Sequence, residues 1–365
     1  MKYLRHRLPI IFMIALFTNC EDSFLDTPPN DRIVSSLFWS TDADAILASH
    51  AVYPYLLQDA MTFASWDAMT DIGHVTLQWR QESIIERGFH NSASGKVAQF
   101  WSYSYEGIQG ANIFLANIDS FEPTNQELID RLKAEVRVIR AKLYLDLVIL
   151  FGDVPMPTSA LSLEESLELT RTPASAVWDF VSSELTTSAA LLPTTQLDKG
   201  RITKGAALGL KARAMLYAGR YTEAADAAKE VMDLEVYSLY PSYENLFSYE
   251  AQNSSEVILD RQFTQNVNFS NIYDIYTPNS LWPQRNDVVP TKLGVDMYKM
   301  ANGKDITDPT SGFDPYDPYT GRDPRLAYSV FTLGSALPNG EMYNPRPGSG
   351  TGDAIGSSEN STYSG

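Results

Sequence analysis

Residues 125–155 read NQELIDRLKAEVRVIRAKLYLDLVILFGDVP, and this stretch decides the fold. Its apolar side chains recur in steps of three and four residues, which places them along one face of a long helix. The glycine and proline of FGDVP (151–155) predict where that helix ends. The apolar positions of the stripe are Leu128, Leu132, Val136, Ile139, Leu143, Leu147 and Leu150.

Shorter helical patterns lie on both sides of this stretch. A helical hairpin is predicted around Gly219, where small residues let two helices approach closely and tyrosines fill the space between turns. Because one such hairpin cannot bury its apolar face alone, about three tetratricopeptide-like helix pairs are expected. The predicted helices are 41–58, 97–119, 172–191, 203–218 and 221–234, and the hairpin residues are Gly209, Tyr217, Tyr221, Ala225 and Ala228.

The residue composition of the chain changes after residue 240. Residues 241–347 are rich in Pro, Asn, Asp and Tyr, and we expect an irregular ligand-binding part there, with a strand in 256–263 and a short helix in 293–300. Residues 348–365 predict a flexible tail, as in a truncated chain. The predicted fold class is mainly α: a tetratricopeptide-like scaffold over 40–240, a loop-rich part and few short strands, in a single domain over 20–365.

The first residues predict export. A basic stretch, an apolar run over 8–17 and Cys20 follow one another as in a secretory signal peptide, here 1–19. Cys20 is the only cysteine, and it stands where a bacterial lipoprotein carries its lipid; the alternative is a chance cysteine after an ordinary signal peptide. Acyl chains on Cys20 would anchor the protein to a membrane.

Composition excludes several classes of protein. With 28 Lys and Arg against 45 Asp and Glu, the formal charge of −17 argues against nucleic-acid binding, which needs a basic surface. A single cysteine excludes internal disulfides and cysteine-based zinc sites. We find no metalloprotease, serine-hydrolase or phosphate-loop motif, and we expect no cofactor.

Four segments together resemble the SusD/RagB family of nutrient-binding outer-membrane lipoproteins of Bacteroidetes. CEDSFLD (20–26) is similar to the start of the mature family members, and RAKLYLDLVILFGDVP (140–155) is close to their most recognisable helix. TKGAALGLKAR (203–213) resembles their later tetratricopeptide unit, and YTGRDPRL (319–326) resembles a turn that follows it.

The resemblance implies a non-enzymatic, surface-exposed protein that captures oligosaccharide for a SusC-like, TonB-dependent outer-membrane transporter. It implies that the helices face the transporter while the loop-rich surface holds the ligand. Some relatives take peptides, so the ligand class stays open. Two alternatives also remain: a glycoside hydrolase, since 45 acids provide many carboxylate pairs, and a tetratricopeptide scaffold that binds protein or peptide.

Sugar binding needs exposed aromatic rings for the apolar face of the sugar, and acids, amides or arginines for its hydroxyl groups. Two loop clusters have this composition, and the resemblance places ligand residues in the same regions. Core packing is the alternative for each tryptophan, and it is our expectation for Trp39, Trp101 and Trp178. The candidate ligand residues are Trp66, Asp67, Asp71, Trp79 and Arg80 in one loop and Tyr273, Tyr276, Trp282, Arg285 and Asn286 in the other.

An acid-rich stretch closes the list of candidates. Asp308, Asp314, Asp317 and Asp323 suggest a calcium loop, but their spacing is not that of an EF-hand. Asp-Pro and similar pairs initiate turns, so turns are the preferred interpretation and no metal site is predicted.

Overall fold

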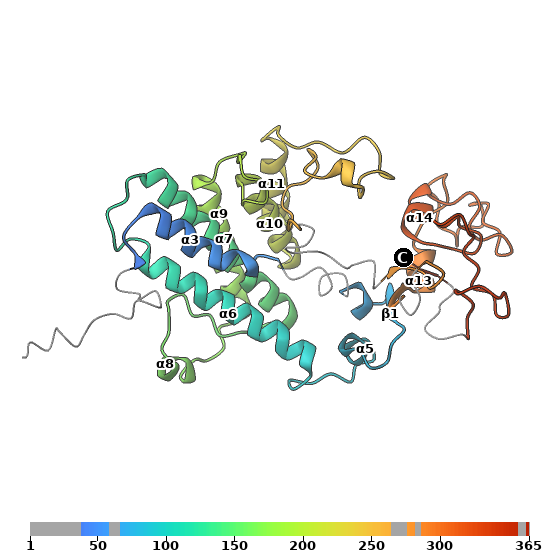
Figure 1. Cartoon of the computed structure of the whole chain (residues 1–365), viewed down its shortest axis with the longest axis horizontal. Helices are drawn as coiled ribbons and strands as arrows, with labels where there is room; N and C mark the ends of the chain where they lie inside the picture. The colour runs from blue at the N-terminus through green and yellow to red at the C-terminus, as the bar shows by residue number, and fades with distance from the viewer. Residues whose placement is uncertain (1–37, 58–65, 264–275, 282–285, 357–362, 365) are drawn as a thin grey trace, which may run out of the picture.

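The computed structural model of the chain describes residues 38–57, 66–263, 276–281, 286–356 and 363–364. The fold is mainly α, as predicted. Figure 1 shows a helical bundle on one side, a loop-rich lobe on the other, and a small strand pair between them. The elements are α3 (Asp42–Val52), α5 (Gln81–Glu86), α6 (Gly95–Asn117), α7 (Gln126–Phe151), α8 (Leu163–Leu167), α9 (Ala174–Leu191), α10 (Lys204–Tyr217), α11 (Tyr221–Met232), α13 (Lys292–Asp296), α14 (Pro324–Ser329), β1 (Gly73–Val75) and β2 (Val288–Pro290).

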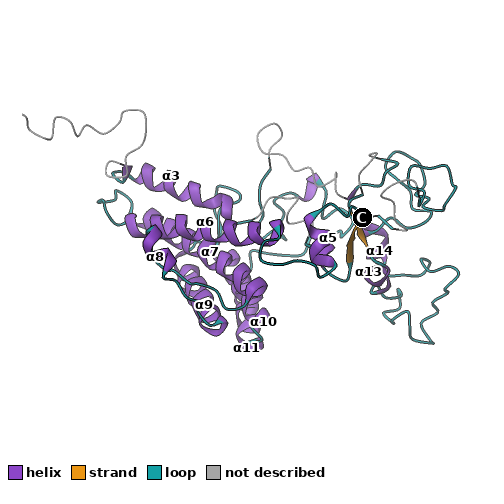
Figure 2. Ribbon diagram, turned by 90° about the horizontal axis from the view of Figure 1, so that it is seen from below, coloured by secondary structure: helices purple, strands orange, loops and turns teal. Residues whose placement is uncertain are grey.

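The long helix α7 is the centre of the bundle. It packs against α3 and α6 on one side and against α9 on the other (Figure 2), and its predicted stripe is buried from Leu132 to Leu147. The Asn125 side chain accepts a hydrogen bond from the Leu128 amide at the start, and Gly152 at φ +69° ends the helix. Both ends therefore lie within one residue of the sequence prediction, because both carry a capping residue.

Two buried ionic groups fix α7 to its neighbours. Arg140 donates to Glu184 on α9 at 2.6 Å and to the Asn112 side chain on α6 at 2.7 Å. Glu135, which is completely buried, pairs with Arg201 at 2.7 Å and accepts from the Tyr53 hydroxyl at 2.9 Å. Because a buried charge is costly when unpaired, these contacts specify how the helices register.

The hairpin α10–α11 forms where it was predicted, but the residues at its interface differ. Ala214 and Ala224 are buried there, whereas Ala225 and Ala228 are exposed and Tyr217 and Tyr221 point to solvent. A shift of one residue on a helix turns a side chain by about 100°, so a run of alanines does not reveal from sequence which of them face inward.

The loop-rich lobe is held by polar contacts more than by long elements. Arg322 is largely buried and donates to the carbonyls of Val295 at 2.8 Å and of Tyr298 at 2.6 Å. In the DPRL turn, Asp323 caps α14 by accepting from the Arg325 amide. The helix expected at 293–300 is α13, which ends at Asp296.

The strand expected in 256–263 is absent: the described residues there form turns and bends. Ile258 and Leu259 pack against the bundle core, and the Glu256 carboxylate accepts from the Tyr240 amide at 2.6 Å. These apolar residues are thus half-buried against the helices without a strand partner.

Within the described part of the expected tail, Asp353 and Ala354 are buried, whereas the glycines around them are exposed. Asp353 is 1% exposed and accepts a hydrogen bond from the Ser280 amide at 2.9 Å, and Ser364 pairs with Phe331 in an isolated antiparallel β-bridge.

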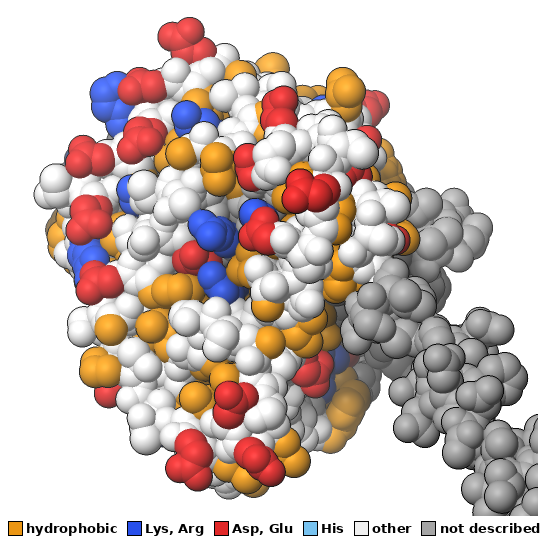
Figure 3. All heavy atoms as spheres, turned by 90° about the vertical axis from the view of Figure 1, so that its left-hand side faces the viewer, with side chains coloured by type: hydrophobic (Ala, Val, Ile, Leu, Met, Phe, Trp, Pro, Cys, Tyr) orange, Lys and Arg blue, Asp and Glu red, His pale blue; other side chains and the backbone are white. Residues whose placement is uncertain are grey.

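Within the described ranges, no helix combines the length and apolar content needed to cross a bilayer. The end of the bundle at the left of Figure 1 carries both acidic and basic groups, scattered among polar and hydrophobic ones (Figure 3).

Candidate functional site

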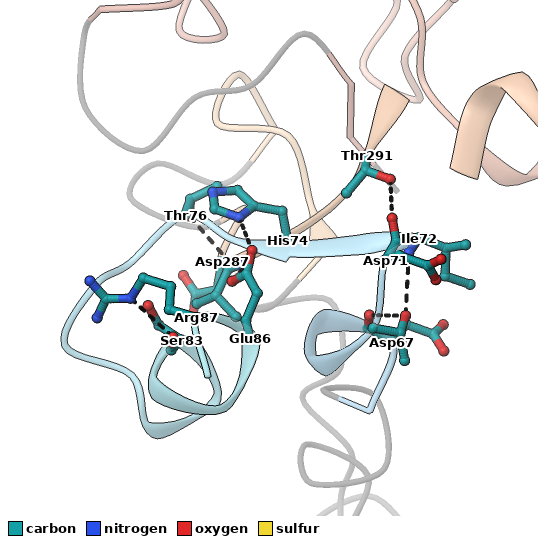
Figure 4. Close-up of polar contacts among 12 residues, drawn as sticks. Asp67, Asp71, Ile72, His74, Thr76, Ser83, Glu86, Arg87, Asp287 and Thr291 are labelled. Carbon is teal, nitrogen blue, oxygen red and sulfur yellow. Dashed lines mark hydrogen bonds and ion pairs between the residues drawn. The ribbon is translucent and has the colours of Figure 1, made fainter. Parts of the chain in front are cut away.

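A two-stranded antiparallel sheet joins the first predicted loop cluster to the segment that follows Asn286 of the second. β1 pairs with β2 in the register Gly73↔Pro290, His74↔Val289 and Val75↔Val288. Around the strands, the Thr291 hydroxyl donates to the Asp71 carbonyl, and His74 contacts Glu86 on α5 (Figure 4). A β-carbon on Gly73 would lie 2.4 Å from the Asp67 carbonyl oxygen, so this close approach requires glycine.

An ionic network also links the loop that carries Arg80 to Asp287, the residue just before β2. Arg80 pairs with Asp287 at 2.8 Å and with Glu82 at 3.4 Å, and Lys96 on α6 pairs with Glu82 at 3.1 Å. All four side chains are at most 11% exposed. Arg80, predicted as a ligand residue, therefore has a clear structural partner in Asp287.

The charge state of Glu82 follows from this network. Burial by itself raises the pKa of Glu82, but the hydrogen bond from its own backbone N–H and the charges of Lys96 and Arg80 outweigh that effect. They lower its pKa to about 2. Glu82 is thus ionised over the whole physiological range, and it holds α5 to α6.

The other predicted residues of the first loop lie in different environments. Trp79 is 74% exposed, and Asp67 and Asp71 are exposed as well. Trp66 is half-buried and stacks on Phe100, with ring centroids 4.8 Å apart and an interplanar angle of 28°. The loop therefore presents one fully exposed ring and one ring that is fixed on a second aromatic side chain.

Of the second cluster, Tyr276 and Asn286 are described. Tyr276 is half-buried against the small apolar cluster that includes Ala68 and Val288; burial, with the Asp67 charge, raises its pKa to about 12. Asn286 is 1% exposed at φ +90°, and its side chain accepts from the Ser364 hydroxyl at 2.8 Å. Cys20, Tyr273, Trp282 and Arg285 lie outside the described residues.

An aromatic cleft of about 760 Å³ opens beside this sheet, where α6 begins and α7 ends. Trp101 meets Phe151 edge to face at 5.2 Å, and the Trp66–Phe100 stack forms another part of the wall. Residues with hydroxyl, amide, imidazole and guanidinium groups line the cleft together with the aromatic rings. The lining residues are Trp66, Met69, Thr70, Ile85, His90, Asn91, Ser92, Val97, Ala98, Phe100, Trp101, Ser102, Leu150, Phe151 and Arg171.

Lys96 connects the aromatic wall of the cleft to the ionic network. The Lys96 ammonium lies 5.7 Å from the centre of the Phe100 ring, and the same Lys96 pairs with Glu82. Phe100 in turn supports Trp66. The position of the Trp66 ring therefore depends on packing and charge pairing beneath it, as a preformed binding surface requires.

Sequence reasoning found Trp66 but missed most of this cleft. Trp101 was expected in the core; it does pack against the core, as do Trp39 and Trp178, but it also lines the cleft. The sequence held no signal for this second role, because a helix with a wide apolar face can bury consecutive aromatic residues. Arg171 had no signal of its own, since the bridge between Val154 and Thr172 brings it there.

The acid-rich stretch behaves as turns. Asp308 accepts from the Thr310 amide at 2.7 Å and Asp314 from the Tyr316 amide at 2.8 Å. Among the described residues, no group of three or more His, Cys, Asp or Glu side chains is arranged to hold a metal ion.

Comparison with known proteins identifies the family. Residues 23–216, more than half of the chain, match the SusD-like family model described as "Starch-binding associating with outer membrane". A SusD-like protein of Formosa agariphila is 26% identical over 277 residues, which are 70% of this chain and 51% of that protein. The chain spans about half the length of the curated relatives it matches.

Solved structures share the fold. A SusD-like carbohydrate-binding protein of Bacteroides fragilis superposes with a TM-score of 0.77 at 24% identity, over 90% of this chain and 67% of that one. A laminarin-binding SusD-like protein gives a TM-score of 0.61 at 24% identity, over 66% of this chain and 58% of that one. With its mainly helical scaffold and the match over residues 23–216, the chain belongs to the SusD-like family.

Proposed function

We propose that the protein binds oligosaccharide without cleaving it, and that the cleft walled by Trp66, Phe100, Trp101 and Phe151 is the binding site. The aromatic cleft within a SusD-like fold is the observation that carries this proposal. Similar solved proteins are described as carbohydrate-binding and laminarin-binding, and the family as starch-binding, which supports the same class of ligand.

The chemistry of the cleft suits a sugar. The C–H face of a pyranose ring packs on an aromatic ring, and its hydroxyl groups require hydrogen-bonding partners at the edge. The Trp66–Phe100 stack supplies a fixed ring, and Thr70, Asn91 and Ser102 supply hydroxyl and amide groups. We propose Trp79, Asp67 and Asp71 as contacts to a longer chain that continues onto the exposed loop.

We further propose that the protein works at the cell surface, anchored to the outer membrane through Cys20, and passes its ligand to a SusC-like transporter. The leader and the single cysteine support the anchor. The face of α10 and α11 supports a partner, because large side chains there are exposed in a way that protein interfaces use. These side chains are Leu216, Tyr217, Tyr221 and Met232.

The binding site can be tested on a glycan array followed by isothermal titration with the best-bound oligosaccharide. Trp66→Ala should weaken binding by roughly two- to tenfold, since stacking on an aromatic ring contributes about 0.5–1.5 kcal/mol. Trp79→Ala is the matched control: it removes the same side chain from the exposed loop, and a smaller loss is expected. Equal, undiminished affinity in both variants would refute the site.

Two further measurements address the alternatives. Chromatography of the incubated oligosaccharide should show no shorter products, whereas a hydrolase would release them. On a peptide array, we expect no peptide whose binding depends on Trp66, so Trp66→Ala should leave the array unchanged.

The anchor and the transporter are tested separately. Metabolic labelling with palmitate should mark the wild type but not Cys20→Ala. Transfer to a transporter should appear as co-purification from detergent-solubilised outer membranes.

A further inference from the structure

The charge of the cleft is opposite to that of the chain. The protein carries 45 acidic and 28 basic residues. Among the described residues that line the cleft, however, the groups able to carry charge are His90 and Arg171, and both are cationic when protonated. A cleft lined by one sign of charge on low-dielectric walls concentrates the field at its mouth.

Arg171 is placed at the rim by the backbone. It directly precedes Thr172, which pairs with Val154 in an antiparallel bridge just after the end of α7. The Thr172 amide donates to the Val154 carbonyl at 2.9 Å, and the Val154 amide donates to the Thr172 carbonyl at 3.2 Å. The bridge fixes the backbone next to Arg171, and Arg171 lines the same cleft as Trp101 and Phe151.

Arg171 is exposed, and its positive charge acts on the nearby Tyr105 hydroxyl. Arg140, Arg80 and Arg201 each pair with a carboxylate in the interior. Within the part of the chain that the structure describes, Arg171 makes no ion pair with any acid, although acids outnumber bases in this protein. An arginine of this kind, beside aromatic rings, is suited to an anionic group because its fork of N–H donors matches two oxygens.

Resting on the carbohydrate-binding function proposed above, we propose that this cleft selects acidic oligosaccharides. The sugar ring stacks on the aromatic wall formed by Trp66 and Trp101, while a carboxylate or sulfate of the same or the next residue pairs with Arg171. His90, on the loop after α5, lines the same cleft and offers an imidazole group for hydrogen bonding.

The expected gain in affinity depends on how exposed the contact between Arg171 and the anionic group is. Arg171 lies at an exposed position, so the contact with an anion is screened by water and salt. A charge-assisted hydrogen bond at a partly desolvated rim is stronger than a free surface pair. We expect the anionic group to strengthen binding by about three- to tenfold at low salt, and less at high salt.

The test uses matched sugars and matched variants. A polysaccharide array containing uronic-acid, sulfated and neutral glycans identifies the best-bound ligands. Oligosaccharides of the best acidic ligand are then compared by titration with the same oligosaccharides after their carboxyl groups are reduced to alcohols, or after desulfation. This pair of treatments distinguishes a carboxylate from a sulfate as the group that is recognised.

Arg171→Gln is the test variant, and Arg213→Gln on α10 is the control, since it removes the same charge from an exposed site outside the cleft lining. Acidic selectivity should disappear in Arg171→Gln and persist in Arg213→Gln. If the neutral glycans bind best, or if Arg171→Gln keeps the full preference, the inference is wrong while the binding function stands. If no glycan binds, the proposed function fails as well.

Discussion

Glu82→Gln tests whether the ionic network beneath the cleft holds the molecule together. Glutamine has the shape of a protonated glutamate, so the variant removes the charge and little else. Lys96 and Arg80 would then lose a partner at sites that are only 9% and 11% exposed. Lowering the pKa of Glu82 from 4.5 to about 2 corresponds to roughly 3 kcal/mol of folding free energy, because each unit of pKa difference corresponds to about 1.36 kcal/mol.

The pH dependence provides the internal control. Because the folded-state pKa lies below the unfolded one, the stabilisation is fully present above about pH 4.5 and is lost as the pH falls toward about 2. Urea unfolding of wild type and Glu82→Gln at pH 7, 5, 4 and 3 should therefore show a difference of about 3 kcal/mol that narrows below pH 4.5. A difference below about 0.5 kcal/mol at pH 7, or one that does not change with pH, would refute the reasoning.

Two further predictions concern the helical bundle. A β-carbon on Gly107 would lie 2.6 Å from the Leu143 side chain, so Gly107→Ala should lower the free energy of unfolding by about 1–3 kcal/mol. A β-carbon on Gly110, on the same helix, would have no atom within 4 Å, so Gly110→Ala should raise the free energy of unfolding by up to about 1 kcal/mol. Arg140→Met leaves Glu184 unpaired and should cost about 3–5 kcal/mol, most of which a second change, Glu184→Leu, should restore. Denaturant titration of the purified proteins measures each value, and equal effects at the two glycines or no recovery in the double variant would contradict them.

The helices were predictable because their signals are local. The apolar stripe from Leu128 to Leu147, the Asn125 cap and the Gly152 terminator are all contained in one stretch of sequence, and α7 forms between them. The same holds for α10, whose start is capped by Thr203. Where the signal depends on helix phase alone, as for Ala225 and Ala228, the predicted inward face is wrong, because both side chains are exposed.

The cleft was only partly predictable because distant segments build it. Trp66 comes from a loop, Trp101 from the start of α6, and Phe151 from the end of α7. The antiparallel packing of two long helices brings the last two together, and no spacing in the sequence encodes that. For the same reason the strand predicted in 256–263 is wrong: its apolar residues are half-buried against the bundle, which a local pattern does not show.

The most direct test of the account is a crystal structure of the protein with the oligosaccharide it binds best. The account predicts a sugar ring in the cleft, in van der Waals contact with Trp66 or Trp101, and an anionic substituent within hydrogen-bonding distance of Arg171. A ligand bound instead on the α10–α11 hairpin, or solely on the exposed loop at Trp79, would contradict it.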